Sequence, residues 1–152
     1  MYSKSYLYNS NIIIYIIYSI YNILFNEESN YIFNNISLQH IFTNSNALFY
    51  FFYNNVFIHK MKVEDVKCIG NANDSTFIRF ESNEKTNLLE IDDLNIKNVF
   101  SHGSFITFEG PSNQLILKNS NIYYSNFYGP FLKKKSEKVK RKNIINFKKN
   151  IF

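Results

Sequence analysis

Apolar and polar residues alternate along the middle of the chain with the period of two that is typical of β-strands. Met61 and Val63 are followed by Val66 and Cys68, and the intervening positions are mostly polar. Two acidic residues, Glu64-Asp65, interrupt the alternation and favour a turn. The pattern predicts a unit made of a strand, a tight corner, a second strand, a longer loop and a third strand, without a helical stripe.

This unit is repeated along the chain. Residues 63–68 (VEDVKC) resemble residues 91–96 (IDDLNI), and residues 75–81 (STFIRFE) resemble residues 103–109 (GSFITFE). Both pairs of blocks are separated by the same offset along the sequence. Two blocks that match at one offset without a gap indicate a true internal repeat.

Further copies lie on both sides of this pair. Downstream, a slightly shorter offset places Leu117 after Ile91 and Gly129 after Gly103. Upstream, residues 36–41 correspond to 61–66, and residues 48–51 correspond to 77–80 at a longer offset. The changing offsets indicate insertions and deletions in loops.

A single unit of this kind cannot bury both sides of its apolar row, so the copies are expected to stack. Stacking at about 4.8 Å allows backbone hydrogen bonds to run from one copy to the next. We expect columns of inward side chains, Val63 over Ile91 over Leu117 and Cys68 over Ile96 over Ile122, each buried member contributing about 1.5–3 kcal/mol. The predicted fold is all-β, a parallel β-solenoid of about four coils of three strands.

The repeats occupy residues 33–132, between an apolar segment (1–32) and a basic tail (133–152). The run IIIYIIYSIYNILF at 12–25 is shorter than the ~20 residues of a membrane-spanning helix, so no stable span is expected. It matches the hydrophobic region of a signal peptide, although no A-x-A cleavage pattern follows. The alternative is a pair of buried strands that cap the repeats.

Composition and charge exclude several classes. The chain has 24 Asn, 21 Ile, 16 Phe and 12 Tyr, with 4 Gly and 2 Pro, which rules out collagen and coiled coils. Cys68 is the only cysteine, so an internal disulfide and a zinc cluster are excluded. Residues 133–152 hold nine of the 17 basic residues and one acid, Glu137, a formal charge of +8. Because the rest of the chain is mildly acidic, we expect no nucleic-acid partner and a solvated tail.

The blocks LLEIDDLNIKNVFSHGSFITFEG (88–110) and QLILKNSNIYYSNFYGPFL (114–132) resemble the right-handed parallel β-helix proteins of the pectin-lyase-like group. Their Asn-rich turns look most like the repeat arrays of scaffoldin-type proteins of anaerobic gut fungi. The resemblance implies a right-handed, secreted, non-catalytic platform that holds dockerin-bearing enzymes on plant polysaccharide. The chain is short for such an array, so it is also interpreted as a fragment of a longer one.

Carboxylates supply the candidate chemistry. Glu64-Asp65 and Asp92-Asp93 would stack on neighbouring coils, where four carboxylates can bind Ca²⁺ or act as acid and base. The next copy carries Lys118-Asn119 at that place, so we favour a solvated corner. Glu81 and Glu109 form a second stacked pair, interpreted in the same way.

No residue is assigned a catalytic, cofactor-binding or metal-binding role. Arg79 is expected to be an exposed partner of Glu81. His40, His59 and His102 are scattered without metal-ligand spacing. Cys68 is expected to be a small buried hydrophobe.

Outward aromatic side chains are the candidate binding residues. They crowd the last copy, with a second group at Tyr50, Phe52 and Tyr53, and can stack on sugar rings or a protein partner. The predicted binding residues are Tyr123, Tyr124, Phe127 and Tyr128.

These observations predict a non-catalytic β-helix module, secreted or at the cell surface, that needs no cofactor and binds a protein or a plant polysaccharide. The alternative is a polysaccharide lyase or hydrolase of the pectin-lyase-like fold. An enzyme requires carboxylates, or a carboxylate with Arg79, to converge on one outer face. A module predicts a polar face without such convergence.

Overall fold

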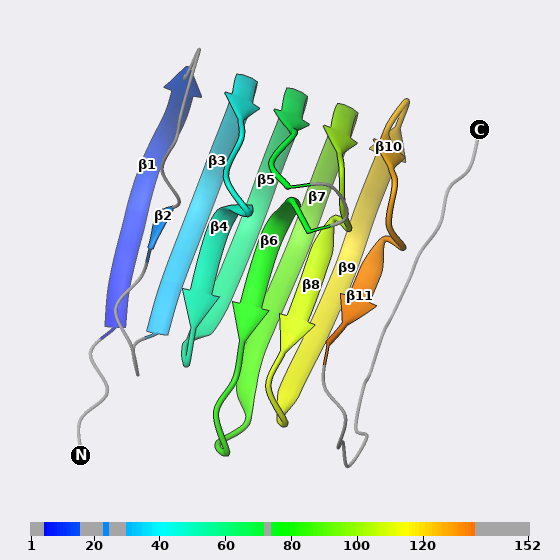
Figure 1. Ribbon diagram of the computed structural model, residues 1–152. Helices are drawn as coiled ribbons and strands as arrows, with labels where there is room; N and C mark the ends of the chain where they lie inside the picture. The colour runs from blue at the N-terminus through cyan, green and yellow to red at the C-terminus, as the bar shows by residue number, and fades with distance from the viewer. Residues whose placement is uncertain (1–4, 16–22, 25–29, 72–73, 136–152) are drawn as a thin grey trace.

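A computed structural model describes residues 5–15, 23–24, 30–71 and 74–135, which form strands and no helix. All strand pairs are parallel, and they build two sheets that face each other across the core (Figure 1). The six-stranded sheet contains β1 (Ser5–Tyr15), β3 (Asn30–Thr43), β5 (Asn55–Cys68), β7 (Asn87–Ser101), β9 (Asn113–Tyr123) and β10 (Asn126–Phe127). The five-stranded sheet contains β2 (Ile23–Leu24), β4 (Ala47–Phe52), β6 (Thr76–Glu81), β8 (Ile106–Glu109) and β11 (Leu132–Lys134).

From β1 to β9 the chain alternates between the two sheets, a long strand and then a short one, and so winds into a parallel β-solenoid of about four turns. In the last coil β10 adds to the six-stranded sheet before β11 joins the other. Each strand pairs with the strand one coil away, as β3 does with β5 and β4 does with β6. The predicted all-β solenoid is therefore confirmed. Right-handed winding and a count of three strands per coil stay predictions.

Each of the long strands β3, β5, β7 and β9 is associated with two corner residues that have positive φ. In β5 these are Lys60 (φ 59°) and Asp65 (φ 55°), and the strand pairing skips both. The equivalent residues lie in register in the other coils, with the same spacing between the members of each pair: Asn35 and His40, Asp93 and Asn98, Asn119 and Tyr124. Asn and Asp tolerate this left-handed conformation best. The pairing is therefore interrupted at Asp65 and Asp93, within the two predicted corners, although β5 and β7 each continue through them as one strand.

Most of the predicted register is confirmed. On the long strands, Leu38 pairs with Val63 and Ile91 pairs with Leu117, as the repeat alignment predicts. On the short strands, Phe49 pairs with Ile78, and Ile78 pairs in turn with Ile106. The alignment of the β4, β6 and β8 blocks is therefore the one expected from the sequence.

The register between β5 and β7 differs from the prediction. Val63 lies opposite Ile96, not Ile91, and Cys68 lies opposite Ser101, not Ile96, so β7 is shifted by five positions from the predicted alignment. The cause is the length of the loops, because the connection at residues 69–75 is longer than its counterpart at 102–105. The inward residues of a long strand recur every five positions, so a slip of this size keeps every apolar side chain inside.

The core runs along the solenoid axis between the sheets. Phenylalanines from successive coils stack inside it, with ring centroids of Phe77 and Phe105 4.8 Å apart and those of Phe105 and Phe131 5.0 Å apart. Cys68 is fully buried, as predicted, and burial raises the pKa of its thiol to about 12. The thiol is therefore protonated and inaccessible at neutral pH.

The structure describes part of each segment predicted to flank the repeats, residues 1–32 and 133–152. Strand β1 pairs in parallel with β3, so residues 5–15 add a strand to the six-stranded sheet, while the pair of buried strands expected at 12–25 stays a prediction. Much of the apolar run at 12–25 lies outside the described residues, and signal cleavage stays a prediction. Among the described residues, no helix is long and apolar enough to cross a membrane. Strand β11 includes Lys133 and Lys134, so the last coil extends into the segment predicted to be a tail. Residues 136–152 of that segment lie outside the described residues.

Candidate functional site

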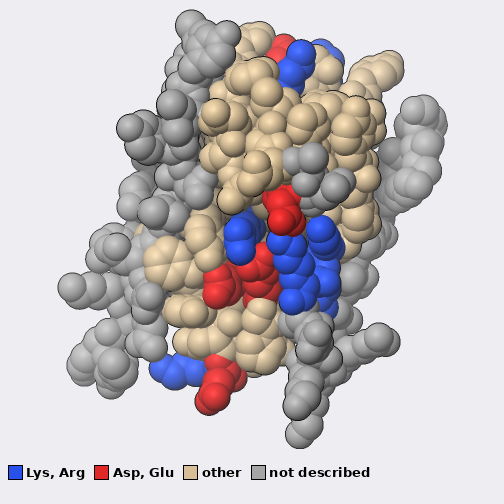
Figure 2. All heavy atoms as spheres, in the orientation of Figure 1, with Lys and Arg blue, Asp and Glu red and all other residues tan. Residues whose placement is uncertain are grey.

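The outer face of the five-stranded sheet carries a compact cluster of charged side chains. Outward residues of β4, β6, β8 and β11 lie in two adjacent rows across this face, which we call the short-sheet face. Figure 2 shows basic and acidic side chains concentrated at its centre. The first row contains Tyr50, Arg79, Thr107 and Lys133, and the second contains Phe52, Glu81 and Glu109, with Lys135 at its end.

Arg79 is the centre of this cluster. Its Nη2 lies 2.6 Å from Glu109 Oε2, and its guanidinium carbon lies 5.0 Å from the centroid of the Tyr50 ring. The hydroxyl of Tyr50 donates a hydrogen bond to Glu81 Oε2. The parallel register brings these groups together, because it places Tyr50, Arg79 and Thr107 side by side on successive strands.

Two lysines at the end of the stack join the cluster. Lys135 Nζ lies 2.6 Å from Asp74 and 3.3 Å from Glu109 Oε1, and Lys133 Nζ lies 3.7 Å from Asp74. Asp74 belongs to the loop before β6, so these ion pairs connect the last coil to that loop. The sequence interpretation missed these contacts by assigning both lysines to a solvated tail. The signal was present, because continuing the last repeat offset along the chain places Lys133 next to Thr107.

The pKa shifts in the cluster follow from these contacts. Burial and the Glu81 hydrogen bond raise the pKa of Tyr50 to about 12, which keeps its phenol neutral. Burial alone would lower the pKa of Arg79, but the hydrogen bond and charge of Glu109 outweigh it and raise that pKa. The hydrogen bond between Lys135 and Asp74 raises the pKa of the amine and lowers that of the carboxyl. The three groups Arg79, Lys135 and Asp74 are therefore charged at neutral pH.

The cluster retains unused hydrogen-bonding capacity. Among the described residues, the buried Nε of Arg79 and Oε1 of Glu109 have no hydrogen-bond partner, although Lys135 lies within ion-pair distance of the latter. Buried polar atoms are usually satisfied by protein, water or ligand. Both atoms are enclosed by the protein, and the amine of Lys135 beside Glu109 Oε1 compensates the charge of that carboxylate.

The two acidic corners do not behave as the sequence suggested. Since the β5–β7 pairing is shifted from the predicted alignment, Asp65 shares a column with Asn98, and Asp93 with Lys60. The predicted stack of four carboxylates is wrong. Within the described part of the chain, no group of three or more His, Cys, Asp or Glu residues is placed to hold a metal ion.

The predicted Glu81–Glu109 pair is confirmed, whereas the predicted partner of Arg79 is not. Glu81 and Glu109 are neighbours in register, as predicted. Arg79 is half-buried, and its recorded ion pair is with Glu109, whereas it was expected to pair with Glu81 as an exposed group. Glu64 on the opposite sheet pairs with Lys62 (3.0 Å) and Lys97 (2.7 Å), whose hydrogen bonds lower its pKa to about 2.

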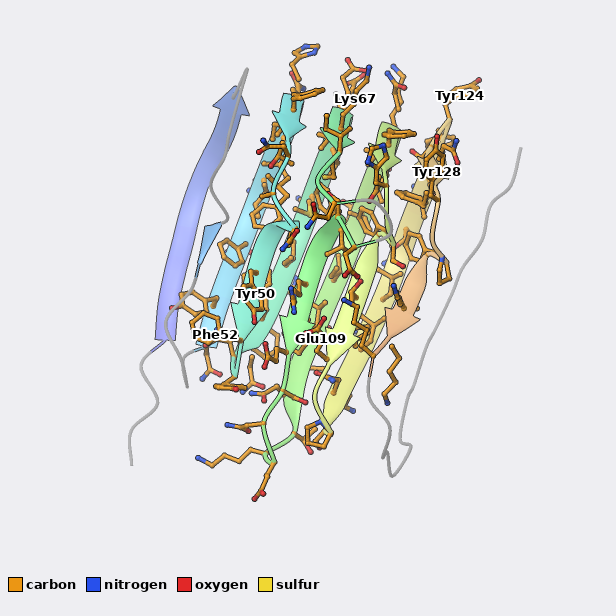
Figure 3. All side chains as sticks on the ribbon, in the orientation of Figure 1. Tyr50, Phe52, Lys67, Glu109, Tyr124 and Tyr128 are labelled. Atoms are coloured by element: carbon orange, nitrogen blue, oxygen red, sulfur yellow. The ribbon has the colours of Figure 1, made fainter. Side chains whose placement is uncertain are left out.

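The predicted aromatic binding residues divide into two groups. Tyr123, Tyr124 and Tyr128 are exposed, by 41%, 88% and 67%. Phe127 was expected to point outward, but it packs against the core, 5.4 Å from Phe105 between ring centroids. Figure 3 shows that Tyr124 and Tyr128 lie far from the Tyr50 and Phe52 side chains on β4.

Tyr128 belongs to a small outward aromatic cluster that the sequence did not reveal. Its ring stacks on His102, with centroids 5.6 Å apart and planes at 13°, and meets Phe100 edge-on at 5.3 Å. His102 in turn lies 3.2 Å from the carbonyl oxygen of Gly70 through its Nδ1. A histidine that seemed isolated along the chain is therefore part of an aromatic surface.

These features define a parallel β-solenoid protein with a charged face and a separate aromatic cluster. No protein-family model, curated protein or solved structure matches the chain in comparisons of sequence and fold. The conclusion about function therefore depends on the geometry of the two surfaces.

Proposed function

We propose that this protein is a non-catalytic β-solenoid module that acts as a scaffold and presents a binding surface, secreted or at the cell surface, as its resemblance to scaffoldin-type repeat proteins suggests. The observation that carries the proposal is the pair of registered rows on the short-sheet face. An aromatic edge, Tyr50 and Phe52, adjoins Arg79 and two carboxylates on successive strands. Right-handed winding belongs to the same proposal.

Plant polysaccharide is the ligand that this arrangement suits best. Aromatic rings stack on the apolar faces of sugars, and charged side chains beside them hydrogen-bond to hydroxyl groups. The strands repeat about every 4.8 Å along the axis, a spacing comparable with that of sugar units in a chain, so each side chain of a row faces about one sugar unit.

A pull-down with insoluble cellulose, xylan and pectin, and with dockerin domains, tests the proposal. We expect retention by at least one polysaccharide, and a severalfold loss for Phe52→Ala. Phe57→Ala is the matched control, because Phe57 points outward from β5 on the opposite sheet. No retention by any polysaccharide or dockerin domain would leave only a spacer role, and equal losses in both variants would remove the site from this face.

A second function, a polysaccharide lyase or hydrolase, is favoured by one observation. Glu81, Glu109 and Arg79 converge on a single outer face, which is the arrangement such an enzyme requires. Two points support the non-catalytic module instead: the Arg79–Glu109 ion pair and the Tyr50–Glu81 hydrogen bond already engage these groups.

Incubation with pectins and xylans separates the two functions. New reducing ends or unsaturated products that disappear in Glu81→Gln or Glu109→Gln would establish the enzyme and overturn the non-catalytic module. Absence of product together with retention on polysaccharide would support the module. Because the glutamines keep the shape of both side chains, the comparison tests charge and proton transfer with little change in packing.

A further inference from the structure

One end of the solenoid presents a long strand edge. Strand β9 (Asn113–Tyr123) pairs with β7 on one side and, among the described residues, with no strand on the other. Its sequence, NQLILKNSNIY, contains one charged residue and no proline. Proteins usually protect such edges with charges, proline or a bulge, because an exposed row of backbone donors and acceptors can pair with another chain.

The apolar columns also end at this strand. Val63 and Ile96 are completely buried, whereas Ile122, the next residue of the same column, is 39% exposed. Its neighbour Tyr123 is 41% exposed. A further coil on β9 would cover Ile122 as Ile122 covers Ile96, and its burial would contribute as the rest of the column does.

The opposite end of the stack has the matching edge. Strand β1 pairs with β3 in parallel and is the terminal strand of its sheet in the part of the chain that the structure describes. The register places Ile14 beside Leu38, so the series of paired positions that ends at Ile122 begins at Ile14. Figure 1 shows β1 and β9 at opposite ends of the same sheet.

We propose that copies of this chain assemble head to tail, with β1 of one copy pairing in parallel with β9 of the next. In this contact Ile14 lies opposite Ile122, and Tyr15 lies opposite Tyr123. The pairing of β1 with β3 is interrupted between Asn9 and Ile12, beside the Asn35 corner, so the interruption at Asn119 in β9 has a counterpart in β1.

This contact is heterologous, because the two surfaces that meet are different. Translation along the axis does not close on itself, so the expected product is a growing linear filament instead of a dimer. The assembly would repeat the short-sheet face along its length, but it depends only on the strand edges and not on what that face binds.

The mass of the intact protein, followed by light scattering and sedimentation over a range of concentrations, tests the assembly. We expect species above 18.1 kDa that grow with concentration. Ile122→Lys should raise the concentration needed for assembly by about tenfold or more, since a charge would have to be buried in the column. Tyr128→Lys is the control, because Tyr128 is exposed and lies outside β9. A monomer at all concentrations would overturn the proposal.

Cysteine cross-linking determines the orientation. In a Cys68→Ala background, the pair Tyr15→Cys and Tyr123→Cys should form intermolecular disulfides and a ladder of oligomers. Tyr123→Cys alone should form no disulfide-linked dimers, and efficient covalent dimers from this single variant would show a two-fold contact and overturn the head-to-tail arrangement. Far-UV circular dichroism confirms that each variant keeps its strands. Polysaccharide retention by a strictly monomeric protein would overturn the assembly while leaving the binding function intact.

Discussion

The register between β5 and β7 can be tested directly by an engineered disulfide. Lys62 lies opposite Asn95 in the structure, with both side chains pointing outward. Paired positions on adjacent strands are about 4.8 Å apart, within the roughly 4.4–6.8 Å between Cα atoms that a disulfide spans. The alignment suggested by the sequence would instead place Lys62 opposite Glu90, which lies about 16 Å further along the strand.

The double variant Lys62→Cys and Asn95→Cys should therefore oxidise rapidly, and Lys62→Cys with Glu90→Cys should not. The disulfide closes a loop of about 33 residues, which predicts a gain of about 3–4 kcal/mol in the free energy of unfolding. The assay is quantification of free thiols after mild oxidation, followed by urea denaturation with and without reductant. Cys68 is buried and should not compete. Faster oxidation of the 62/90 pair would refute the register and the columns built on it.

Three further predictions concern the core, the corners and the charged cluster. Phe105→Ala should cost about 3–5 kcal/mol in denaturant unfolding, because the ring stacks between Phe77 and Phe131, while exposed Tyr128→Ala should change stability by less than about 0.5 kcal/mol. Lys60→Asn should stabilise the protein by about 0.5–1 kcal/mol by relieving the positive φ, whereas Lys67→Asn on the same strand should bring no gain. One tyrosine should ionise near pH 12 in an absorbance titration, and Tyr50→Phe should remove that component. Since folding raises this pKa above its usual value of 10.0, its contribution to stability is present below pH 10 and is lost as the pH rises through about 12.

The charged cluster shows where sequence reasoning reaches its limit. The stacking of Glu81 on Glu109 follows from side-chain parity and a constant offset, so it was predictable. The docking of Lys133 and Lys135 was not predicted, because the run of lysines was interpreted as a solvated segment. The repeat offset already places Lys133 beside Thr107, but only the folded backbone brings Asp74 from a distant loop to meet Lys135.

The sequence by itself determined the strands, their inward and outward faces, the acidic corners and the parallel stacking of the coils. Each of these depends on local periodicity and on short turns, which leave a direct pattern in the order of residues. The tertiary structure alone decided the pairing of β5 with β7 and the partner of Arg79. Inward residues recur every five positions in the long strands, so two registers that differ by this spacing bury the same kinds of side chain. The loop lengths and the packing of the whole stack then select one of them.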